Sequence, residues 1–303
     1  MNCAVELASQ HKTGLALKNP LMIASGFGGY GLELSRMYDI SRLGAIVTAP
    51  VSLHPWPGSS QPRLKEVAAG YLLHTGDQNP GLRQVLRQYA KAWASWDTAV
   101  IVRLAGASAD EYATLAARLE NVEGVAGLEL KLTQAGKGQE EIAAAQELLR
   151  AVRQATALPL LAVLPLPVAG GLPEAAVEAG ADALVVAAPT QGTLLITQER
   201  APFTGELYGA GLLPLSLHEL HRIAQRVSAP LIGRGGIHSA DDALAYLLAG
   251  ASAVQVDSAI LRQPTAPWDI REELERWMLA QGIADIAELI GGALPSAPPI
   301  SPG

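Results

Sequence analysis

Apolar runs alternate with amphipathic stretches along almost the whole chain. Eight runs rich in Val, Ile, Leu and Ala have the length of buried strands: residues 20–25, 45–49, 98–105, 125–132, 159–165, 182–188, 230–234 and 252–257. Residues at helical spacing follow several of them, at 81–96, 109–122, 139–155, 217–227 and 240–250. Strands that are apolar on both faces and alternate with helices are typical of a parallel sheet covered by helices. Eight such strands close a TIM barrel, so we predict a single (β/α)8 barrel over residues 1–290.

Two connections are too long for ordinary loops between a strand and a helix. Residues 50–80 follow the second strand, and residues 189–213 follow the sixth. Long loops in compact domains usually carry function, and these two leave the carboxyl ends of strands, where barrel enzymes build their active sites. The final residues, 291–303, are rich in Pro and Ser. We predict that they form a disordered tail.

The composition narrows the class of protein. The 303 residues are 49% hydrophobic and 17% charged, which suffices for a large core. A net charge of −7 without a basic cluster argues against nucleic-acid binding. The single cysteine, Cys3, excludes internal disulfides and cysteine-based metal clusters, and we predict no metal site. No apolar run reaches the roughly 18 residues of a membrane span, and the N-terminus lacks a signal pattern. We expect a cytoplasmic protein that does not bind membranes.

Residues 231–261 contain the clearest candidate binding site. Gly235 and Gly236 follow a predicted strand, and glycine lets backbone amides approach a phosphate closely. Arg234 precedes the glycines, and Asp257 ends the next strand, where its carboxylate would repel a phosphate. We predict that Arg234 and Asp257 pair across neighbouring strands and fill a vacated phosphate site. Ser239 resembles the cap of the helix that follows.

Several longer stretches carry a family resemblance. They are residues 17–48 and the segments PWPGSSQPR, GDQNPGL, GLELKLT, AGADALVV and GELYG, together with residues 231–261. In these the chain resembles the soluble dihydroorotate dehydrogenases, which are FMN-containing (β/α)8 barrels. The resemblance implies an FMN site, vestigial or retained, at Ser25, Gly26, Gly209, Gly235, Gly236 and Ser258. It also implies a homo-oligomer, or a hetero-oligomer with another protein subunit.

The same resemblance exposes departures from the family. The family oxidises dihydroorotate with a Cys or Ser base after the fourth strand, and here that position is Gln134, whose amide accepts no proton near neutral pH. Other asparagine, lysine and serine or threonine positions of the family fall on Ala49, Leu73, Lys131, Gly136, Val163, Ala188 and Pro189. A catalytic base and its anchors act as a unit. We therefore predict that dihydroorotate oxidation is lost and that the chain is a non-catalytic or scaffolding subunit.

An alternative is an FMN-binding oxidoreductase with a remodelled pocket and a different substrate. His74, Arg103 and Lys131 are the polar candidates for that pocket. His74 either forms a proton-transfer pair with Asp77 or is simply a polar residue of a loop, and we favour the second interpretation. Lys131 is either a Schiff-base lysine or, as we favour, the partner of Glu129 in an interior ion pair. A binding module without turnover is a third possibility. Flavin absorbance of the purified protein would separate the three.

Overall fold

Eight parallel strands close the predicted barrel. The computed structural model describes residues 1–68, 70–132, 138–187, 189–197 and 200–295. Around the barrel the strand order is β10-β13-β14-β3-β4-β7-β8-β9. The bounds are β3 Leu21–Ile23, β4 Ala45–Val47, β7 Ala99–Leu104, β8 Val125–Lys131, β9 Leu160–Val163, β10 Ala183–Val186, β13 Leu231–Arg234 and β14 Ala251–Val256. Seven barrel strands lie inside predicted runs, and β14 begins one residue before its run. The (β/α)8 architecture is therefore confirmed.

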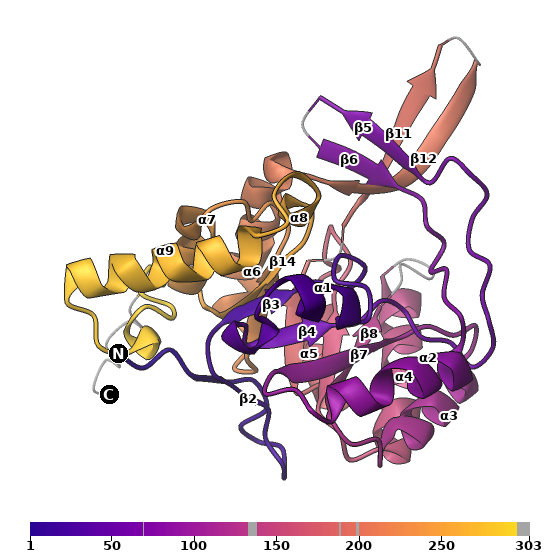
Figure 1. Cartoon of the computed structure of the whole chain (residues 1–303), viewed down its shortest axis with the longest axis horizontal. Helices are drawn as coiled ribbons and strands as arrows, with labels where there is room; N and C mark the ends of the chain where they lie inside the picture. The colour runs from indigo at the N-terminus through magenta and orange to yellow at the C-terminus, as the bar shows by residue number, and fades with distance from the viewer. Residues whose placement is uncertain (69, 133–137, 188, 198–199, 296–303) are drawn as a thin grey trace.

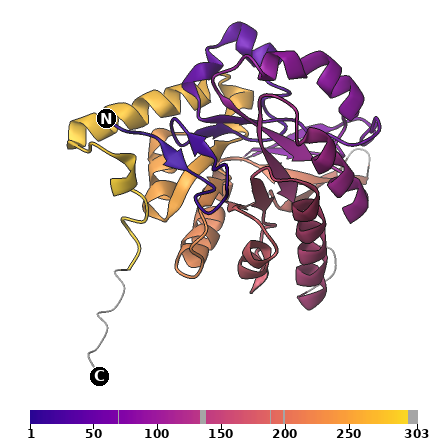
Figure 2. The ribbon, with the colours of Figure 1, turned by 90° about the horizontal axis from the view of Figure 1, so that it is seen from below.

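Helices surround the barrel (Figures 1 and 2). They are α1 Leu32–Met37, α2 Leu82–Trp93, α3 Ala109–Leu119, α4 Gln139–Ala155, α5 Leu172–Glu178, α6 Leu213–Ala224, α7 Ala240–Leu248, α8 Ala259–Arg262 and α9 Ala266–Gln281, with short 3-10 turns η1 Ile40–Arg42, η2 Ala210–Leu212 and η3 Ile286–Glu288. The predicted cap of α7 is present as a capping box, in which Ser239 and Asp242 each accept the other's amide. Such a box stabilises the start of a helix by satisfying two amides that the helix leaves unpaired.

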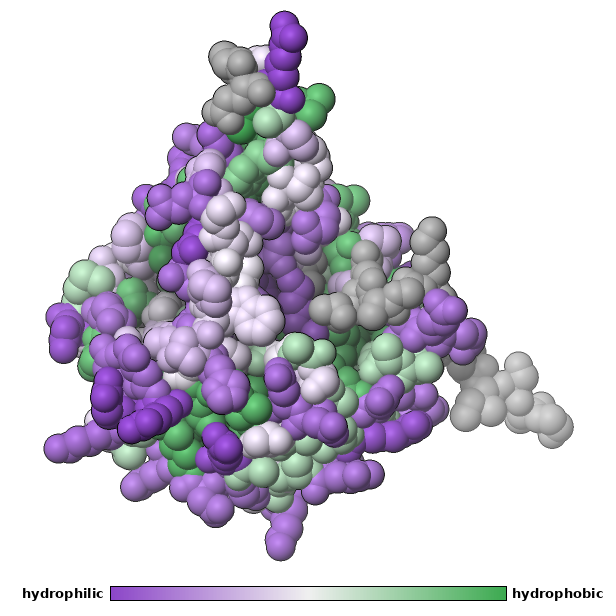
Figure 3. Space-filling model, turned by 90° about the vertical axis from the view of Figure 1, so that its right-hand side faces the viewer, coloured by the Kyte–Doolittle hydropathy of each residue, from purple (hydrophilic) through white to green (hydrophobic). Residues whose placement is uncertain are grey.

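The two long connections pair with each other in a second sheet. Residues 50–80 contain β5 Leu64–Val67 and β6 Gly70–Leu73, and residues 189–213 contain β11 Gln191–Ile196 and β12 Ala201–Tyr208. The sheet is antiparallel in the order β11-β12-β6-β5. It stands off one end of the barrel in Figure 1 and forms the narrow upper part of the molecule in Figure 3. The sequence pattern predicts long loops here, and the structure shows strands.

A short hairpin and the last described residues complete the fold. The hairpin consists of β1 Val5–Glu6 and β2 Ala16–Leu17. Near the other end of the chain, the amides of Gly291 and Ala293 donate to the carbonyls of Leu247 and Leu248, both at 2.9 Å. The packed chain therefore passes the predicted boundary at residue 290, and the disordered tail stays a prediction for residues 296–303, outside the described part. Among the described helices, none combines the length and apolarity of a membrane span.

Candidate active site at the barrel mouth

Charged side chains line the inside of the barrel near the carboxyl ends of its strands. Arg103 and Glu129 are register partners on β7 and β8, and register partners point to the same side of a parallel sheet. From across the barrel, the side-chain amide of Gln255 on β14 donates to Glu129 Oε2 at 2.7 Å. Glu129 and Gln255 are fully buried. Glu129, Arg103 and, two residues along β8, Lys131 thus face the barrel interior.

Lys131 connects the barrel to the second sheet. Its Nζ forms an ion pair with Glu206 of β12, and the hydroxyl of Tyr208 donates to the other carboxylate oxygen at 2.8 Å. Burial alone would raise the pKa of Glu206, but Lys131, Tyr208 and Arg103 together outweigh burial and lower it. Burial and then the Glu206 charge raise the pKa of Tyr208 well above its ordinary value. Glu206 is thus ionised at neutral pH, and Tyr208 keeps the proton that it donates.

A cavity of about 230 Å³ lies beside this ion pair. It is lined by Leu73, His74, Thr75, Gly76, Asp77, Lys131, Gln191, Gly205 and Glu206. We call it the mouth pocket. Arg103 reaches its wall, because one guanidinium nitrogen lies 3.3 Å from Asp77 Oδ2. Burial would lower the pKa of Arg103, but the negative groups around it, Asp77 before Glu129 and Glu206, together outweigh burial and raise it.

The structure therefore brings the three predicted pocket residues together, although one predicted pairing differs. The interior pair of Lys131 with Glu129 is wrong, because Lys131 pairs with Glu206 and Glu129 with Gln255. Among the described contacts, His74 makes no hydrogen bond to Asp77. Its ring instead packs edge-on against Phe203, with centroids 6.2 Å apart. Gln134, the predicted position of the lost base, lies outside the described residues, as do Gly136 and Ala188.

The glycine turn after β13 has a left-handed backbone. Gly235 and Gly236 have φ of +103° and +75°, a region that favours glycine. A Cβ on Gly235 would lie 2.7 Å from Ser216 Oγ, and one on Gly236 would collide with the backbone nitrogen of Leu213. The hydroxyl of Tyr246 donates to the carbonyl of Gly235 at 2.8 Å. Close packing against α6 thus requires both glycines. We call Gly235 and Gly236 the cradle.

Arg234 and Asp257 are both buried beside the cradle, with 3% and 2% of their surfaces exposed. No ion pair within 4 Å joins them among the described residues, so the predicted pair is not formed. The register explains this, because Arg234 lies beside Gln255 and Asp257 lies two residues farther on. Asp257 Oδ1 accepts the amide and the hydroxyl of Ser258 instead, while Arg234 Nε is buried without a hydrogen-bond partner.

These contacts show how far the site fits FMN. The cradle fits a phosphate through its backbone, and the buried Arg234 guanidinium, with Nε unpartnered, fits an anionic ligand. The amide of Ser258 does not fit this role, because Asp257 already occupies it. Within the described chain, no cluster of three His, Cys, Asp or Glu side chains is placed to hold a metal.

The other predicted cofactor residues lie around the same end of the barrel. Gly209 lines a hollow of about 490 Å³ together with His238, and His238 Nε2 lies 3.4 Å from Ser258 Oγ. Ser25 is buried and donates to the carbonyl of Thr48 at 2.7 Å. Gly26 is exposed, with open space where a side chain would project. The ends of β3, β13 and β14 and the loop after β12 therefore meet at one mouth.

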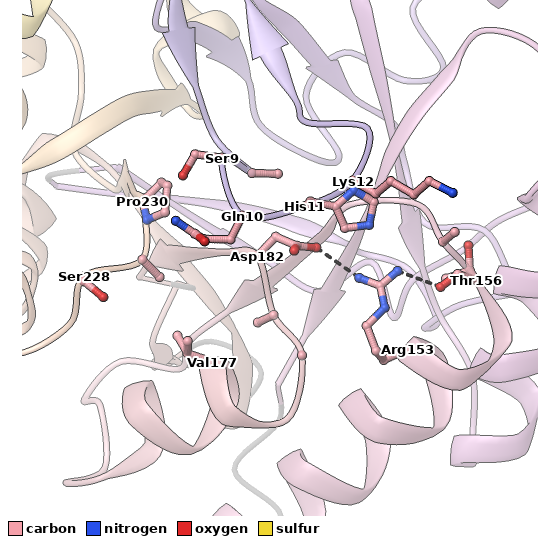
Figure 4. Close-up of a pocket in the computed structure, with 15 residues that line it drawn as sticks. Ser9, Gln10, His11, Lys12, Arg153, Thr156, Val177, Asp182, Ser228 and Pro230 are labelled. Carbon is pink, nitrogen blue, oxygen red and sulfur yellow. Dashed lines mark hydrogen bonds and ion pairs between the residues drawn. The ribbon is translucent and has the colours of Figure 1, made fainter.

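A larger hollow, of about 670 Å³, lies at the opposite end of the barrel (Figure 4). Its walls include the hairpin loop at residues 8–12 and residues just before β9, β10 and β13. The Arg153 guanidinium crosses it to Asp182 at 3.1 Å and to the carbonyl of Thr156 at 2.6 Å. Arg153 is thus satisfied by the protein itself, and no predicted site residue lies here. Size alone does not make this hollow the candidate active site.

Comparison with known proteins agrees with the barrel fold. The sequence model of the family described as "Dihydroorotate dehydrogenase" matches residues 7–278. The chain belongs to the dihydroorotate dehydrogenase family. It is 38% identical to "Dihydroorotate dehydrogenase B (NAD(+)), catalytic subunit" of Desulforudis audaxviator, over 92% of this chain and 95% of the relative. Proteins of the same name from Pelobacter propionicus and Desulforamulus reducens are 38% and 36% identical, over 92% and 97% of this chain and 95% and 99% of the relatives.

This finding corrects the functional prediction. A non-catalytic, scaffolding role is wrong, because relatives that align with nearly the whole chain are named as catalytic subunits. The prediction of a non-catalytic chain relied on lost side chains, such as the base at Gln134, although the glycines of the cradle are retained. Changed side chains in a retained barrel are also what a change of substrate produces.

Proposed function

We propose that this chain is an FMN-dependent oxidoreductase of the dihydroorotate dehydrogenase type whose remodelled mouth pocket takes a substrate other than dihydroorotate. The observation that carries the proposal is the cradle. Gly235 and Gly236 keep left-handed conformations that place backbone amides at the end of a barrel strand. A glycine pair held in this way is suited to a phosphate group.

The chain's own residues divide the mouth into two parts. Gly235 and Gly236 would hold the cofactor phosphate, with the exposed Gly26 leaving backbone open beside it. When bound, FMN supplies the acceptor for hydride from the substrate. The second sheet contributes Glu206, which pairs with Lys131 of the barrel, and the buried Tyr208.

The mouth pocket indicates a small, polar substrate. Its volume of about 230 Å³ corresponds to roughly eight water molecules at about 30 Å³ each. Lys131 offers hydrogen-bond donors, and Glu206 offers acceptors that stay ionised because the pKa of its carboxyl is lowered. Both groups are already paired with each other, so a substrate must complement the pair rather than a lone charge. Substrates with a donor and an acceptor side by side meet this requirement.

A partner subunit is part of the proposal. The relatives are named as catalytic subunits of enzymes that use NAD+. By analogy, the present chain would work beside a second protein subunit and pass electrons to NAD+.

Reconstitution with FMN tests the proposal. The purified protein is incubated with excess FMN, desalted and examined for visible flavin absorbance, with riboflavin as the matched ligand that lacks the phosphate. We expect stoichiometric FMN and at least about tenfold weaker binding of riboflavin, because hydrogen bonds to charged groups contribute about 1.5–3 kcal/mol. Dihydroorotate should reduce the bound flavin far more slowly than dithionite does. A protein that stays colourless and gains no thermal stability from FMN would contradict the proposal.

A further inference from the structure

The hollow of about 670 Å³ lies at the end of the barrel opposite the cradle (Figure 4). Its walls come from the loop of the β1–β2 hairpin and from the segments that lead into β9, β10 and β13. We call this space the basal hollow. Its volume falls within the roughly 300–1,000 Å³ of small-molecule sites. The basal hollow is therefore large enough for an organic ligand.

Hydrogen bonds within the protein hold both walls of the basal hollow in place. Glu6 accepts the amides of Ala8 and Leu15 at 2.8 and 2.6 Å, which fixes both ends of the hairpin loop. On the other side, the Arg153 guanidinium donates to Asp182 at 3.1 Å and to two backbone carbonyls at 2.6 Å each. Because these acceptors hold Arg153, its side chain forms a wall and does not fill the space. A ligand would thus enter a preformed site, at little cost in ordering.

The walls carry one positive charge that the protein does not neutralise. Asp182, the one acidic residue among the described residues of the lining, is paired with Arg153. Lys12 is exposed, and no carboxylate of the described chain forms an ion pair with it. His11 adds a hydrogen-bond donor, because the amide of Thr13 donates to Nδ1 at 3.3 Å and leaves the proton of the neutral ring on Nε2. The basal hollow therefore favours a ligand with a single negative charge.

Apolar side chains form much of the remaining surface, among them Val177, Ala229 and Pro230. We propose that the basal hollow binds a small organic carboxylate, with its charge near Lys12 and His11 and an apolar body against these three residues. A carboxylate matches one uncompensated positive charge better than a phosphate, which carries about −1.5 to −2 at neutral pH. Active sites of TIM barrels lie at the other end, so this binding site is separate from the chemistry. Neither FMN nor the mouth pocket is needed for binding there.

Calorimetric titration of the whole protein with 2-naphthoate tests the site. The matched ligands are 2-naphthamide, which has the same apolar body without the charge, and acetate, which has the charge without the body. We expect the parent to bind 2-naphthoate more tightly than either. Lys12→Met should weaken 2-naphthoate binding about three- to fivefold, toward the upper end for an exposed ion pair, and leave 2-naphthamide binding unchanged. Lys91→Met, which removes an exposed lysine of α2 outside the basal hollow, should change neither.

A negative charge added to the opposite wall gives a second, independent measurement. Ser228 is exposed and lies across the basal hollow from Lys12 (Figure 4). Ser228→Glu should therefore weaken 2-naphthoate binding by a similar factor and spare 2-naphthamide. A fixed concentration of 2-naphthoate should also raise the unfolding temperature of the parent more than that of either variant. No binding of 2-naphthoate by the parent, or binding that Lys12→Met leaves unchanged, would overturn the inference. Equal affinity of the parent for 2-naphthoate and 2-naphthamide would do so as well, because the charge of Lys12 would then have no role.

Discussion

The cradle and the mouth pocket lie at the same end of the barrel but are built in different ways. The cradle is formed by the backbone: the φ angles of Gly235 and Gly236 and their packing against α6 define it. The mouth pocket is formed by side chains from separate elements, since Lys131 and Glu206 are 75 positions apart in the sequence. A backbone site survives changes in the side chains around it. A side-chain site can be replaced piece by piece, which makes the pocket the place where specificity changes.

The largest expected effect comes from breaking the cradle. Gly236→Ala adds a Cβ against the backbone of Leu213 at a φ of +75°. Strain of this kind costs about 1–3 kcal/mol, and we expect loss of stability in this range together with about hundredfold weaker FMN binding, about 2.8 kcal/mol. Urea unfolding and FMN titration measure the two effects.

Gly170→Ala is the matched control, because an added Cβ there meets nothing within 4 Å and φ is not left-handed. It should be neutral or stabilise the fold by about 0.4–1 kcal/mol through the unfolded state. Equal effects at Gly170 and Gly236 would remove the distinction between a cradle and an ordinary turn.

The pocket can be broken through its ion pair. Lys131 and Glu206 are about one quarter exposed, so their pairing should contribute more than the 0–1 kcal/mol of a surface pair and less than the 3–5 kcal/mol of a fully buried one. We expect a coupling of about 1–2 kcal/mol in a double-mutant cycle of Lys131→Met and Glu206→Gln, measured by urea unfolding. FMN affinity should change less than in Gly236→Ala. Additive single effects would mean that the pair does not hold the second sheet to the barrel.

The sequence allows the barrel and the cradle to be predicted because both depend on local patterns. Apolar runs of strand length mark the eight barrel strands, and a Gly-Gly pair after a strand marks a turn with left-handed φ. The second sheet is different. Exposure alternates along β11, from Gln191 to Ile196, but its residues, QGTLLI, do not alternate between polar and apolar. Its strands pair with a segment more than a hundred residues earlier, which no local pattern reveals.

The charged residues at the mouth were the hardest to pair for the same reason. Lys131 and Glu129 share a strand face, so sequence favours a pair between them, but the second sheet brings Glu206 closer to Lys131. Arg234 and Asp257 sit on neighbouring strands, yet their register is offset by two residues. Type of residue and strand are predictable in both cases, whereas the partner depends on tertiary placement.

The smallest expected effect is a pH dependence that distinguishes the ion pair from burial. The pKa of Glu206 is lowered in the folded protein, so its contribution to stability is present above the unfolded pKa of about 4.3 and is lost as pH falls through the folded value. In Lys131→Met the main cause of the lowering is gone and burial remains, which raises the pKa. The contribution then reverses: it is present below about pH 4.3 and is lost as pH rises through the raised value.

Unfolding free energies between about pH 3 and 7 measure this reversal. Glu206→Gln removes the titrating group and is the reference against which both curves are compared, because the remaining carboxyl groups titrate in all three proteins. Relative to that reference, the parent should gain about 1 kcal/mol on going from low to neutral pH, and Lys131→Met should lose a similar amount. Parallel curves for the parent and Lys131→Met would show that burial and Tyr208, rather than Lys131, determine the charge of Glu206. The ion pair between Lys131 and Glu206 would then contribute little to the structure of the mouth pocket.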